Sequence, residues 1–228
     1  MTQPEHPRSI RSFVTRAGRI TEAQERALRE FWPQYGLEFS LHPLDLQQVF
    51  GRRVPVTAEI GFGNGDNLIA LAAAHPERDY LGIEVHRPGV GRVLLKANEV
   101  GLTNLRVICQ DAVEVLERQL DPDSLDEVLI LFPDPWPKKR HHKRRLVQGP
   151  FVATTASRIR PGGLLRLATD WEPYAHEMLE VLESCPSLRN DAGPRRFSER
   201  PHERAPTRFE RRGTRLGHDV HDLTFRRV

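Results

Sequence analysis

Short apolar runs alternate with longer helical patterns along the chain from Val54 onward. The strand-like runs read VTAEI, DYLGIEV, LRVICQ, EVLILF and LLRLAT. Between them lie DNLIALAAAHP, PGVGRVLLKANEVG, AVEVLERQL, a segment around RRLVQGPFVATTASRI, and WEPYAHEMLEVLES, in which apolar residues recur about every 3.6 positions. Proline or glycine separates these segments, as is typical of strand–helix–strand units. The pattern therefore predicts an α/β domain with a doubly wound parallel sheet.

The two ends of the chain depart from this pattern. Residues 1–53 are predicted to form an N-terminal arm with a short helix near Glu22–Phe31, and the arginines of the arm suit a solvated tail or an RNA-contacting segment. Residues 54–228 are predicted to form the α/β domain, with an arginine-rich insertion at about 189–218 before a last strand-like run, VHDLTFRRV. Residues 195–215 contain eight arginines and three glutamates, which indicates a functional segment or a disordered one.

The composition of the 228 residues fits one soluble domain. Hydrophobic residues make up 38% and charged residues 29%, and no apolar run approaches the ~18 residues that a membrane span requires. The N-terminus lacks a secretory signal pattern, and Cys109 and Cys185 match neither a disulfide framework nor a metal motif. These features predict a cytoplasmic protein without a membrane segment or a metal site. The net charge of +3 does not show whether the protein binds nucleic acid, because a protein with a small net charge can still have a strongly basic face.

A glycine-rich turn follows the first predicted strand of the domain. It reads Glu59-Ile60-Gly61-Phe62-Gly63-Asn64-Gly65, and glycines in this place let the backbone turn sharply and approach a ligand. A dinucleotide-binding turn would have the spacing G-x-G-x-x-G and hold a pyrophosphate at the helix N-terminus. Here the spacing is G-x-G-x-G, with Glu59 two residues before the first glycine. This carboxylate suits S-adenosylmethionine, which carries an ammonium and a sulfonium but no phosphate.

Two further acids lie at the ends of the next two predicted strands. Glu84 closes one strand, where a carboxylate can accept both ribose hydroxyls, and Asp111 follows the other, directly before Ala112. Open α/β sheets bind ligands at the carboxyl ends of their strands, so the turn and the acids are expected to converge on one adenosyl ligand. Each acid alone has a simpler explanation as a solvated carboxylate or a helix cap, and Asp111 suits a cap for the helix starting at Ala112.

A rigid loop follows the fourth predicted strand. Residues 131–145 read LFPDPWPKKRHHKRR, in which two prolines bracket Asp134 and deny it a helical conformation. The carboxylate is thereby held at a strand end beside Trp136, where the reactive methyl group of the cofactor is expected. The alternative is a stiff surface loop with a solvated basic run, as most charge runs are.

These segments together closely resemble the bacterial tRNA (guanine-N7)-methyltransferase family, the TrmB type. The resemblance covers nearly the whole chain. Its matching segments are EIGFGNGDNL, LGIEVHRPGVG, NLRVICQDAVEVL, LFPDPWPKKRHHKRR, LATDWEPYA with Met178 following, and PTRFERRGTRLGH. Several segments in this order make a specific signal. The N-terminal arm and the stretch between Cys185 and Arg204 depart from the family pattern.

The resemblance implies a fold, a reaction and a set of site residues. The fold is a Rossmann-like, doubly wound sheet of the class I S-adenosylmethionine-dependent methyltransferase type. The reaction transfers a methyl group from S-adenosylmethionine to N7 of guanosine 46 in the tRNA variable loop, with no metal and no obligate protein partner implied. The expected cofactor-binding residues are Glu59, Gly61, Gly63, Gly65, Glu84, Asp111, Ala112 and Asp134, of which Asp134 is also the expected catalytic residue. The expected substrate-binding residues are Lys138, Asp170, Thr207, Arg208, Phe209 and Glu210.

The chemistry of guanine N7 defines what these residues must do. N7 already offers a lone pair, so its attack on a sulfonium methyl group needs no strong general base. The reaction needs in-line placement and stabilisation of the positive charge that moves to the purine, for which Asp134 is the candidate. Asp170 or Glu210 would accept hydrogen bonds from guanine N1–H and N2–H and so select guanine over adenine. Asp170 has the alternative of capping the helix that begins near Trp171.

The basic segments are expected to contact the phosphate backbone of folded RNA. They comprise residues 138–145 and the arginines of residues 195–215. Trp136 and Phe209 suit either stacking on a splayed base or plain packing. The rival functions are a methyltransferase with a small-molecule or protein substrate, a non-catalytic RNA-binding protein and, more distantly, a nicotinamide oxidoreductase. A small-molecule or protein substrate would leave the basic segments without a purpose. The complete set of glycines and acids argues against a non-catalytic RNA-binding protein.

Overall fold

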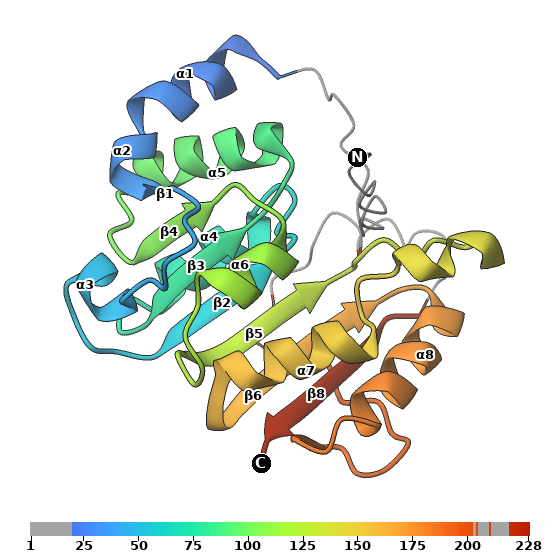
Figure 1. The fold of residues 1–228 in the computed structure, drawn as a ribbon. Coiled ribbons are helices and arrows are strands. Elements are labelled where there is room, and N and C mark those ends of the chain that lie inside the picture. Colours follow the sequence, from blue (N-terminus) through green and yellow to red (C-terminus); the bar gives the residue numbers. More distant parts are fainter. Residues whose placement is uncertain (1–19, 203, 205–209, 211–218) are drawn as a thin grey trace, which may run out of the picture.

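The computed structural model describes residues 20–202, 204, 210 and 219–228 (Figure 1). Its helices are α1 (Glu22–Glu30), α2 (Trp32–Tyr35), α3 (Leu46–Phe50), α4 (Asp66–Ala74), α5 (Arg87–Val100), α6 (Ala112–Arg118), α7 (Gly149–Arg158) and α8 (Glu172–Glu183), with a 3-10 helix, η1, at Lys139–Arg144. Its strands are β1 (Gly36–Leu37), β2 (Val56–Ile60), β3 (Asp79–Ile83), β4 (Leu105–Ile108), β5 (Leu125–Leu131), β6 (Ile159–Thr169), β7 (Leu188–Asn190) and β8 (His221–Arg227). Within these residues, no helix is long and apolar enough to cross a membrane.

Eight strands form one sheet, in the order β1-β4-β3-β2-β5-β6-β8-β7. From β2 the chain builds outward through β3 and β4 and then adds β5 and β6 on the other side of β2 (Figure 1). The strand order thus reverses between β2 and β5, which confirms the doubly wound prediction and marks where such sheets bind ligands. Strands β1 to β6 pair in parallel, whereas β8 runs antiparallel between β6 and β7. The five strands predicted after Val54 pair in parallel, as expected. The direction of the last strand-like run, β8, was not predicted, because an alternating pattern identifies a strand but not its direction.

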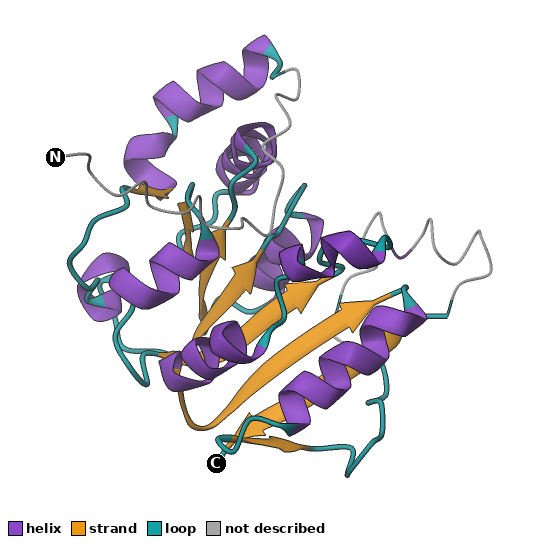
Figure 2. Cartoon of the chain, turned by 45° about the vertical axis from the view of Figure 1, so that its right-hand side comes forward, coloured by secondary structure: helices purple, strands orange, loops and turns teal. Residues whose placement is uncertain are grey.

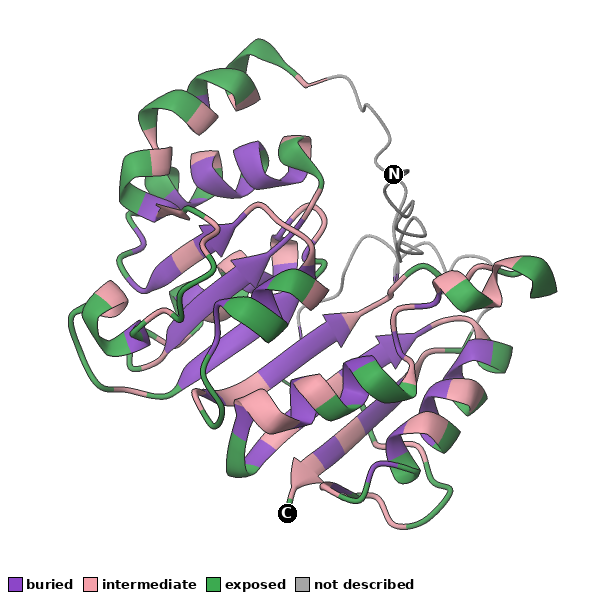
Figure 3. Ribbon diagram, in the orientation of Figure 1, coloured by how far each residue is buried: buried purple, intermediate pink, exposed green. Residues whose placement is uncertain are grey.

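Helices cover both faces of the sheet, and each face has its own hydrophobic cluster (Figure 2). On one face α6, α7 and α8 contribute buried residues such as Val115, Phe151 and Met178. On the other face α4 and α5 contribute Leu68 and Val93. Burial follows the strands and the inner sides of the helices, while the outer helix sides are exposed (Figure 3). The carboxyl ends of the strands are therefore anchored in a packed core, which lets them hold side chains in place.

The described part of the N-terminal arm packs on this core. The predicted short helix is present as α1, where Thr21 and Gln24 form a capping box. Its buried Ala27 lies toward α5, and a Cβ atom added at Gly91 of α5 would lie 2.8 Å from the Gln24 carbonyl oxygen. Further along, β1 pairs with β4 at the sheet edge. Two residues are too few to show a period of alternation, so the sequence pattern did not predict this strand.

Candidate active site

The glycine turn joins the carboxyl end of β2 to α4 and is built from left-handed backbone conformations. Gly61, Gly63 and Gly65 have φ values of +69°, +56° and +72°, which side chains rarely adopt. A Cβ atom added at Gly61 or Gly63 would meet no heavy atom within 4 Å, so this backbone borders open space. A Cβ atom at Gly65 would lie 2.0 Å from Val93 Cγ2. The first two glycines thus leave room for a ligand, and the third permits close packing of α4 on α5.

Glu84 ties the glycine turn to the loop after β3. Its Oε2 accepts a hydrogen bond from the Gly63 N–H at 2.8 Å. Its Oε1 accepts from the N–H groups of Val85 and His86 at 2.7 and 2.9 Å. One carboxylate therefore sets the spacing between two strand-end loops on either side of the expected ligand. This organising role was not predicted from the sequence.

Glu59 lies beneath the same turn and is almost completely buried, with 3% of its surface exposed. Its Oε2 accepts a hydrogen bond from Asn67 Nδ2 of α4 at 2.8 Å. Burial raises the pKa of Glu59 to about 7, the Asn67 hydrogen bond opposes this rise, and the nearby Glu84 adds to it. A buried acid with such a pKa lacks a compensating positive charge. The site is thus suited to a cationic ligand.

Asp111 caps α6, as one alternative predicted. Its Oδ1 accepts a hydrogen bond from the Val113 N–H at 3.0 Å. Ala112, the first helical residue, is buried with 8% exposure. The cap fixes the side chain of Asp111 at the end of β4, adjacent in the sheet to the end of β3 with Glu84. The three predicted cofactor acids thus lie at the ends of three neighbouring strands.

The loop that carries Asp134 starts at the end of β5, on the other side of β2. The Phe132 N–H donates to the Ala168 carbonyl of β6 at 2.7 Å. Phe132 and Trp136 have φ values of +52° and +44°, an unfavourable conformation for bulky residues. Between them, Asp134 is exposed. Such strain persists only where surrounding contacts enforce it, and it is typical of functional sites.

The basic run after this loop forms η1. Within it, the exposed cationic residues are Lys138, Lys139, Arg140 and Lys143. Trp136 packs against this segment, since the Arg144 guanidinium lies 5.2 Å from its ring and His141 lies edge-on to it. The prediction of a phosphate-contacting surface fits the exposed residues. It is wrong for Arg145, whose side chain is 2% exposed and points into the protein.

Two acids were predicted to recognise guanine, and the structure puts them in different surroundings. Asp170 follows β6, on the strand next to the Asp134 loop. Helix α8 begins after the N-cap residue Trp171, which makes no side-chain cap hydrogen bond, so Asp170 is not the N-cap residue. Glu210 is buried at 8% exposure. The predicted substrate residues Thr207, Arg208 and Phe209 lie outside the described residues.

Two arginines, the buried Arg204 and the exposed Arg200, form ion pairs with Glu210. Arg204 donates to its two carboxylate oxygens at 2.9 and 3.3 Å, and Arg200 donates at 2.8 Å. Arg204 also pairs with Asp222 of β8 at 3.1 Å and lies 5.6 Å from the Phe132 ring. Burial raises the pKa of Asp222, and Arg204 opposes this rise. The network links Glu210 to β8 and to the start of the Asp134 loop.

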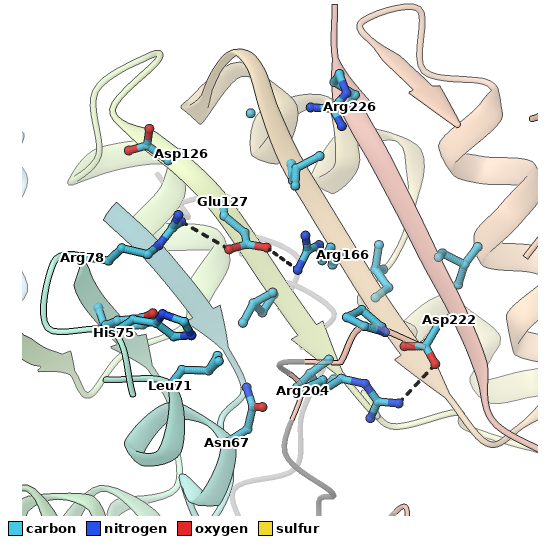
Figure 4. A pocket seen from close by; sticks show the side chains of 18 of the residues that line it. Asn67, Leu71, His75, Arg78, Asp126, Glu127, Arg166, Arg204, Asp222 and Arg226 are labelled. Atoms are coloured by element: carbon cyan, nitrogen blue, oxygen red, sulfur yellow. Dashed lines mark hydrogen bonds and ion pairs between the residues drawn. The ribbon is translucent and has the colours of Figure 1, made fainter. Parts of the chain in front are cut away.

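A cavity of about 500 Å³ lies on the α4 face of the sheet, between α4 and β8 (Figure 4). Glu127 of β5 stands in it between Arg78 and Arg166, at 3.4 and 3.1 Å. Asn67, which binds Glu59, and Arg204 both line the end of the cavity at the carboxyl ends of the strands (Figure 4). The cavity therefore adjoins the strand-end site, but its charged side chains already pair with one another. The sequence pattern did not predict it, because alternation shows which residues share a sheet face and not what covers that face.

Comparison with known proteins agrees with this geometry. Residues 53–223 match the model of Methyltransf_4, a family of methyltransferases. The tRNA (guanine-N(7)-)-methyltransferase of Alkalilimnicola ehrlichii is 57% identical over 222 residues, covering 96% of this chain and 93% of the relative. The same-named proteins of Leifsonia xyli and Salmonella typhimurium are 57% and 53% identical, over 95% and 97% of this chain and 95% and 92% of theirs.

Solved structures with the same fold are more distant in sequence. The 16S rRNA methyltransferase KamB is 20% identical with a TM-score of 0.60, over 82% of this chain and 95% of that protein. The aminoglycoside resistance methyltransferase NpmB1 is 16% identical with a TM-score of 0.58, over 81% and 92%. These likenesses show the methyltransferase fold, and the close relatives show the family. The chain belongs to the bacterial tRNA (guanine-N7)-methyltransferase family.

Proposed function

We propose that this protein transfers the methyl group of S-adenosylmethionine to N7 of guanosine 46 in the variable loop of tRNA. The observation that carries the proposal is the order of neighbouring strand ends. The open glycine turn and the three acids follow β2, β3 and β4, and the Asp134 loop and η1 follow β5, which is paired with β2. This order supports a single site in which a ligand at the glycine turn would face the candidate catalytic acid and the cationic residues. The close relatives carry the name of this activity, which supports the choice of substrate.

The residues around the glycine turn fit S-adenosylmethionine. The open side of Gly61 and Gly63 leaves room for the ligand against bare backbone. Glu84 would hold the ribose hydroxyls, while the hydrogen bonds that it accepts from three backbone N–H groups keep its carboxylate in a fixed orientation. The raised pKa of Glu59 leaves an acid that a cationic ligand would ionise. Asp111 and Ala112 would line the adenine end at β4, and no metal is required by this set.

Binding of S-adenosylmethionine is expected to strengthen as pH rises to about 7. In the free protein the pKa of Glu59 is about 7, above its ordinary 4.5, so this residue is mostly protonated at lower pH. A cationic ligand favours the carboxylate, and binding must then release a proton. The Kd at pH ~6 is therefore expected to be roughly tenfold higher than at pH ~8. Calorimetry in buffers of different ionisation enthalpy measures both the Kd and the released proton.

The variant Glu59→Gln serves as the control for this pH dependence. It should bind S-adenosylmethionine more weakly and with little change in Kd over the same pH range. The raised pKa also predicts that the free energy of unfolding of the free wild-type protein falls as pH rises from 4.5 to about 7, because the folded state binds the proton more tightly. A wild-type Kd that stays constant across this range would contradict the role of Glu59.

The reaction needs no strong general base from the protein, because guanine N7 already has a free lone pair. Bound S-adenosylmethionine supplies an electrophilic methyl group on a sulfonium. The task of Asp134 is to stabilise the positive charge as it moves onto the purine, and its prolines hold the carboxylate in place before the reaction. Asp170, on the adjacent strand end, would accept hydrogen bonds from the guanine N1–H and N2–H groups. Lys138 would contact the neighbouring phosphate.

We propose a different division of labour for Glu210. Its oxygens already accept hydrogen bonds from Arg200 and Arg204, and Arg204 also pairs with Asp222 of β8, so the first task of Glu210 is structural. Base recognition then falls mainly to Asp170. This reassignment follows from the ion pairs of Glu210.

Neutralising one exposed cation of η1 is expected to weaken tRNA binding without changing the chemical step. In Lys143→Ala, the slope of log K against log salt concentration should decrease by about one unit or less, because one phosphate contact releases about one counterion. All tRNAs should be affected alike, and the single-turnover rate at saturating tRNA should stay at the wild-type value. Filter binding across a salt series measures the slope. An unchanged slope would remove Lys143 from the RNA surface.

The proposed function is tested by mass analysis of nucleosides. Unmodified tRNA transcript is incubated with the protein and S-adenosylmethionine, and 7-methylguanosine is expected in the digest. A transcript with adenosine in place of guanosine 46 is the matched control and should yield none. Methylation of that control at another guanosine would overturn the proposed position, and absence of 7-methylguanosine from both transcripts would overturn the function.

A further inference from the structure

We propose that Arg145 is a positioning residue that holds the Asp134 loop in its active conformation. The inference deepens the proposed function and rests on it. In the sequence Arg145 is the last member of a basic run and looks like its neighbours. In the structure its side chain is 2% exposed, whereas Arg140 and Lys143 are exposed. A buried guanidinium cannot reach an RNA phosphate, so its charge serves another purpose.

The guanidinium of Arg145 joins three segments of the site: the Asp134 loop, η1 and α8. Its Nε–H donates to the Pro135 carbonyl at 2.9 Å, and Nη1 donates to the Glu177 carboxylate on α8. Its Nη2 lies 3.1 Å from His142 Nε2 in η1. The guanidinium also lies 4.7 Å from the ring of Tyr174, which is completely buried. A planar, forked cation is needed to meet these partners at once, which a lysine ammonium cannot do.

The contact with Pro135 is the one that bears on catalysis. Pro135 directly follows Asp134, and its carbonyl is fixed by Arg145 to a helix in the core. The next residue, Trp136, has a φ of +44°, so the loop is held in a conformation that it would not adopt by itself. Without its anchor the loop is expected to relax and to move the Asp134 carboxylate.

The same anchor relates Asp134 to the other side of the substrate site. Helix α8, which carries Tyr174 and Glu177, begins two residues after Asp170. Arg145 therefore fixes the loop of Asp134 to the element that follows Asp170, and it also contacts η1 through His142. Placement of the two acids relative to each other thus depends on one buried cation that touches neither the cofactor nor the base.

The test separates the rate of methyl transfer from tRNA binding. In Arg145→Lys, the single-turnover rate at saturating tRNA and S-adenosylmethionine should fall roughly tenfold or more, because a small misplacement of a catalytic group has large effects. The tRNA Kd and its salt slope should stay at the wild-type values. The matched control is Arg118→Lys, at an exposed arginine of α6 outside the basic run. It should leave both the saturated rate and the salt slope unchanged.

Two further variants separate positioning from general stability. Tyr174→Phe removes the hydroxyl that accepts from the Val147 N–H at 3.2 Å but keeps the ring against Arg145, so the melting temperature should fall while the transfer rate is kept. Glu177→Ala removes a partner whose side chain is 35% exposed, so it should fold and lower the transfer rate less than Arg145→Lys does. It provides the decisive measurement if Arg145→Lys does not fold.

The outcomes distinguish this inference from the function on which it rests. A wild-type protein that forms no 7-methylguanosine overturns the proposed function and the inference together. An active wild type overturns the inference alone if Arg145→Lys and Glu177→Ala both transfer methyl groups at its rate. Equal loss of rate in Tyr174→Phe and Arg145→Lys would also overturn it, because destabilisation would then explain both.

Discussion

Replacing Asp134 by asparagine is expected to slow single-turnover methyl transfer by about 10²-fold or more, the size of effect seen when one preorganised charge-stabilising group is lost. Asparagine has nearly the same shape as aspartate, and Asp134 is exposed in a loop whose course is set by prolines and by Arg145. The variant should therefore fold and bind tRNA like the wild type. What it lacks is the negative charge that faces the purine as it becomes cationic.

The measurement is a single-turnover rate at saturating concentrations of both substrates, together with the Kd of S-adenosylmethionine. The separate Kd matters because Asp134 is also proposed to contact the cofactor, and weaker binding must not be mistaken for slower chemistry. The matched control is Asp123→Asn. Asp123 is an exposed acid with a φ of +57° at the opposite end of β5, and its variant should react at the wild-type rate. If Asp134→Asn transferred methyl groups at the wild-type rate, the proposal that Asp134 stabilises charge would be contradicted.

Much of the ligand site could be predicted from the order of strands and helices along the chain. Once strands and helices alternate, the carboxyl ends of parallel strands must share one edge, so Glu59, Glu84 and Asp111 had to lie near the glycine turn. The same rule brought the Asp134 loop beside them. Backbone hydrogen bonds and helix packing fix these positions. Both can be predicted from the pattern of apolar residues in the sequence, which any soluble α/β domain shows.

Side-chain direction within irregular segments did not follow from the sequence. Residues 138–145 look uniformly basic, yet the turns of η1 expose Arg140 and bury Arg145 against α8. Which cation points inward depends on tertiary contacts with Tyr174 and Glu177, more than 25 positions away in the chain. The ion pairs of Glu210 likewise depend on where β8 lies, and no local period reports that.

The hydrogen bonds of Glu84 show that this predicted cofactor residue also has a structural role. Glu84 was expected at a strand end for its chemistry toward ribose, and its position agrees with that expectation. Its three bonds to backbone N–H groups show that it organises the turn as well. A carboxylate that is already oriented loses little freedom when a ligand binds, so preorganisation should contribute to affinity.

Replacing Glu84 by alanine is therefore expected to weaken S-adenosylmethionine binding by about 10- to 150-fold, on the order of 1.5–3 kcal/mol for lost charge-assisted hydrogen bonds. The upper part of this range is expected, because the Gly63 amide loses its partner and the turn loses its link to the loop after β3. The tRNA Kd should change little, since η1 follows a different strand of the sheet. Calorimetry with S-adenosylmethionine and with its demethylated product measures the loss.

The matched control is Asp66→Asn, which changes an acid of the same region without disturbing the turn. Asp66 is the first residue of α4, directly after Gly65, and it pairs with Arg92 at 3.2 Å on the protein surface. Its removal changes the local charge by the same amount as Glu84→Ala does, so a purely long-range electrostatic effect would weaken binding comparably in both variants. Strong loss in Glu84→Ala alone would support direct contact and preorganisation. Wild-type affinity in Glu84→Ala would remove Glu84 from the cofactor site, and the glycine turn would then need another acid to hold a cationic nucleoside.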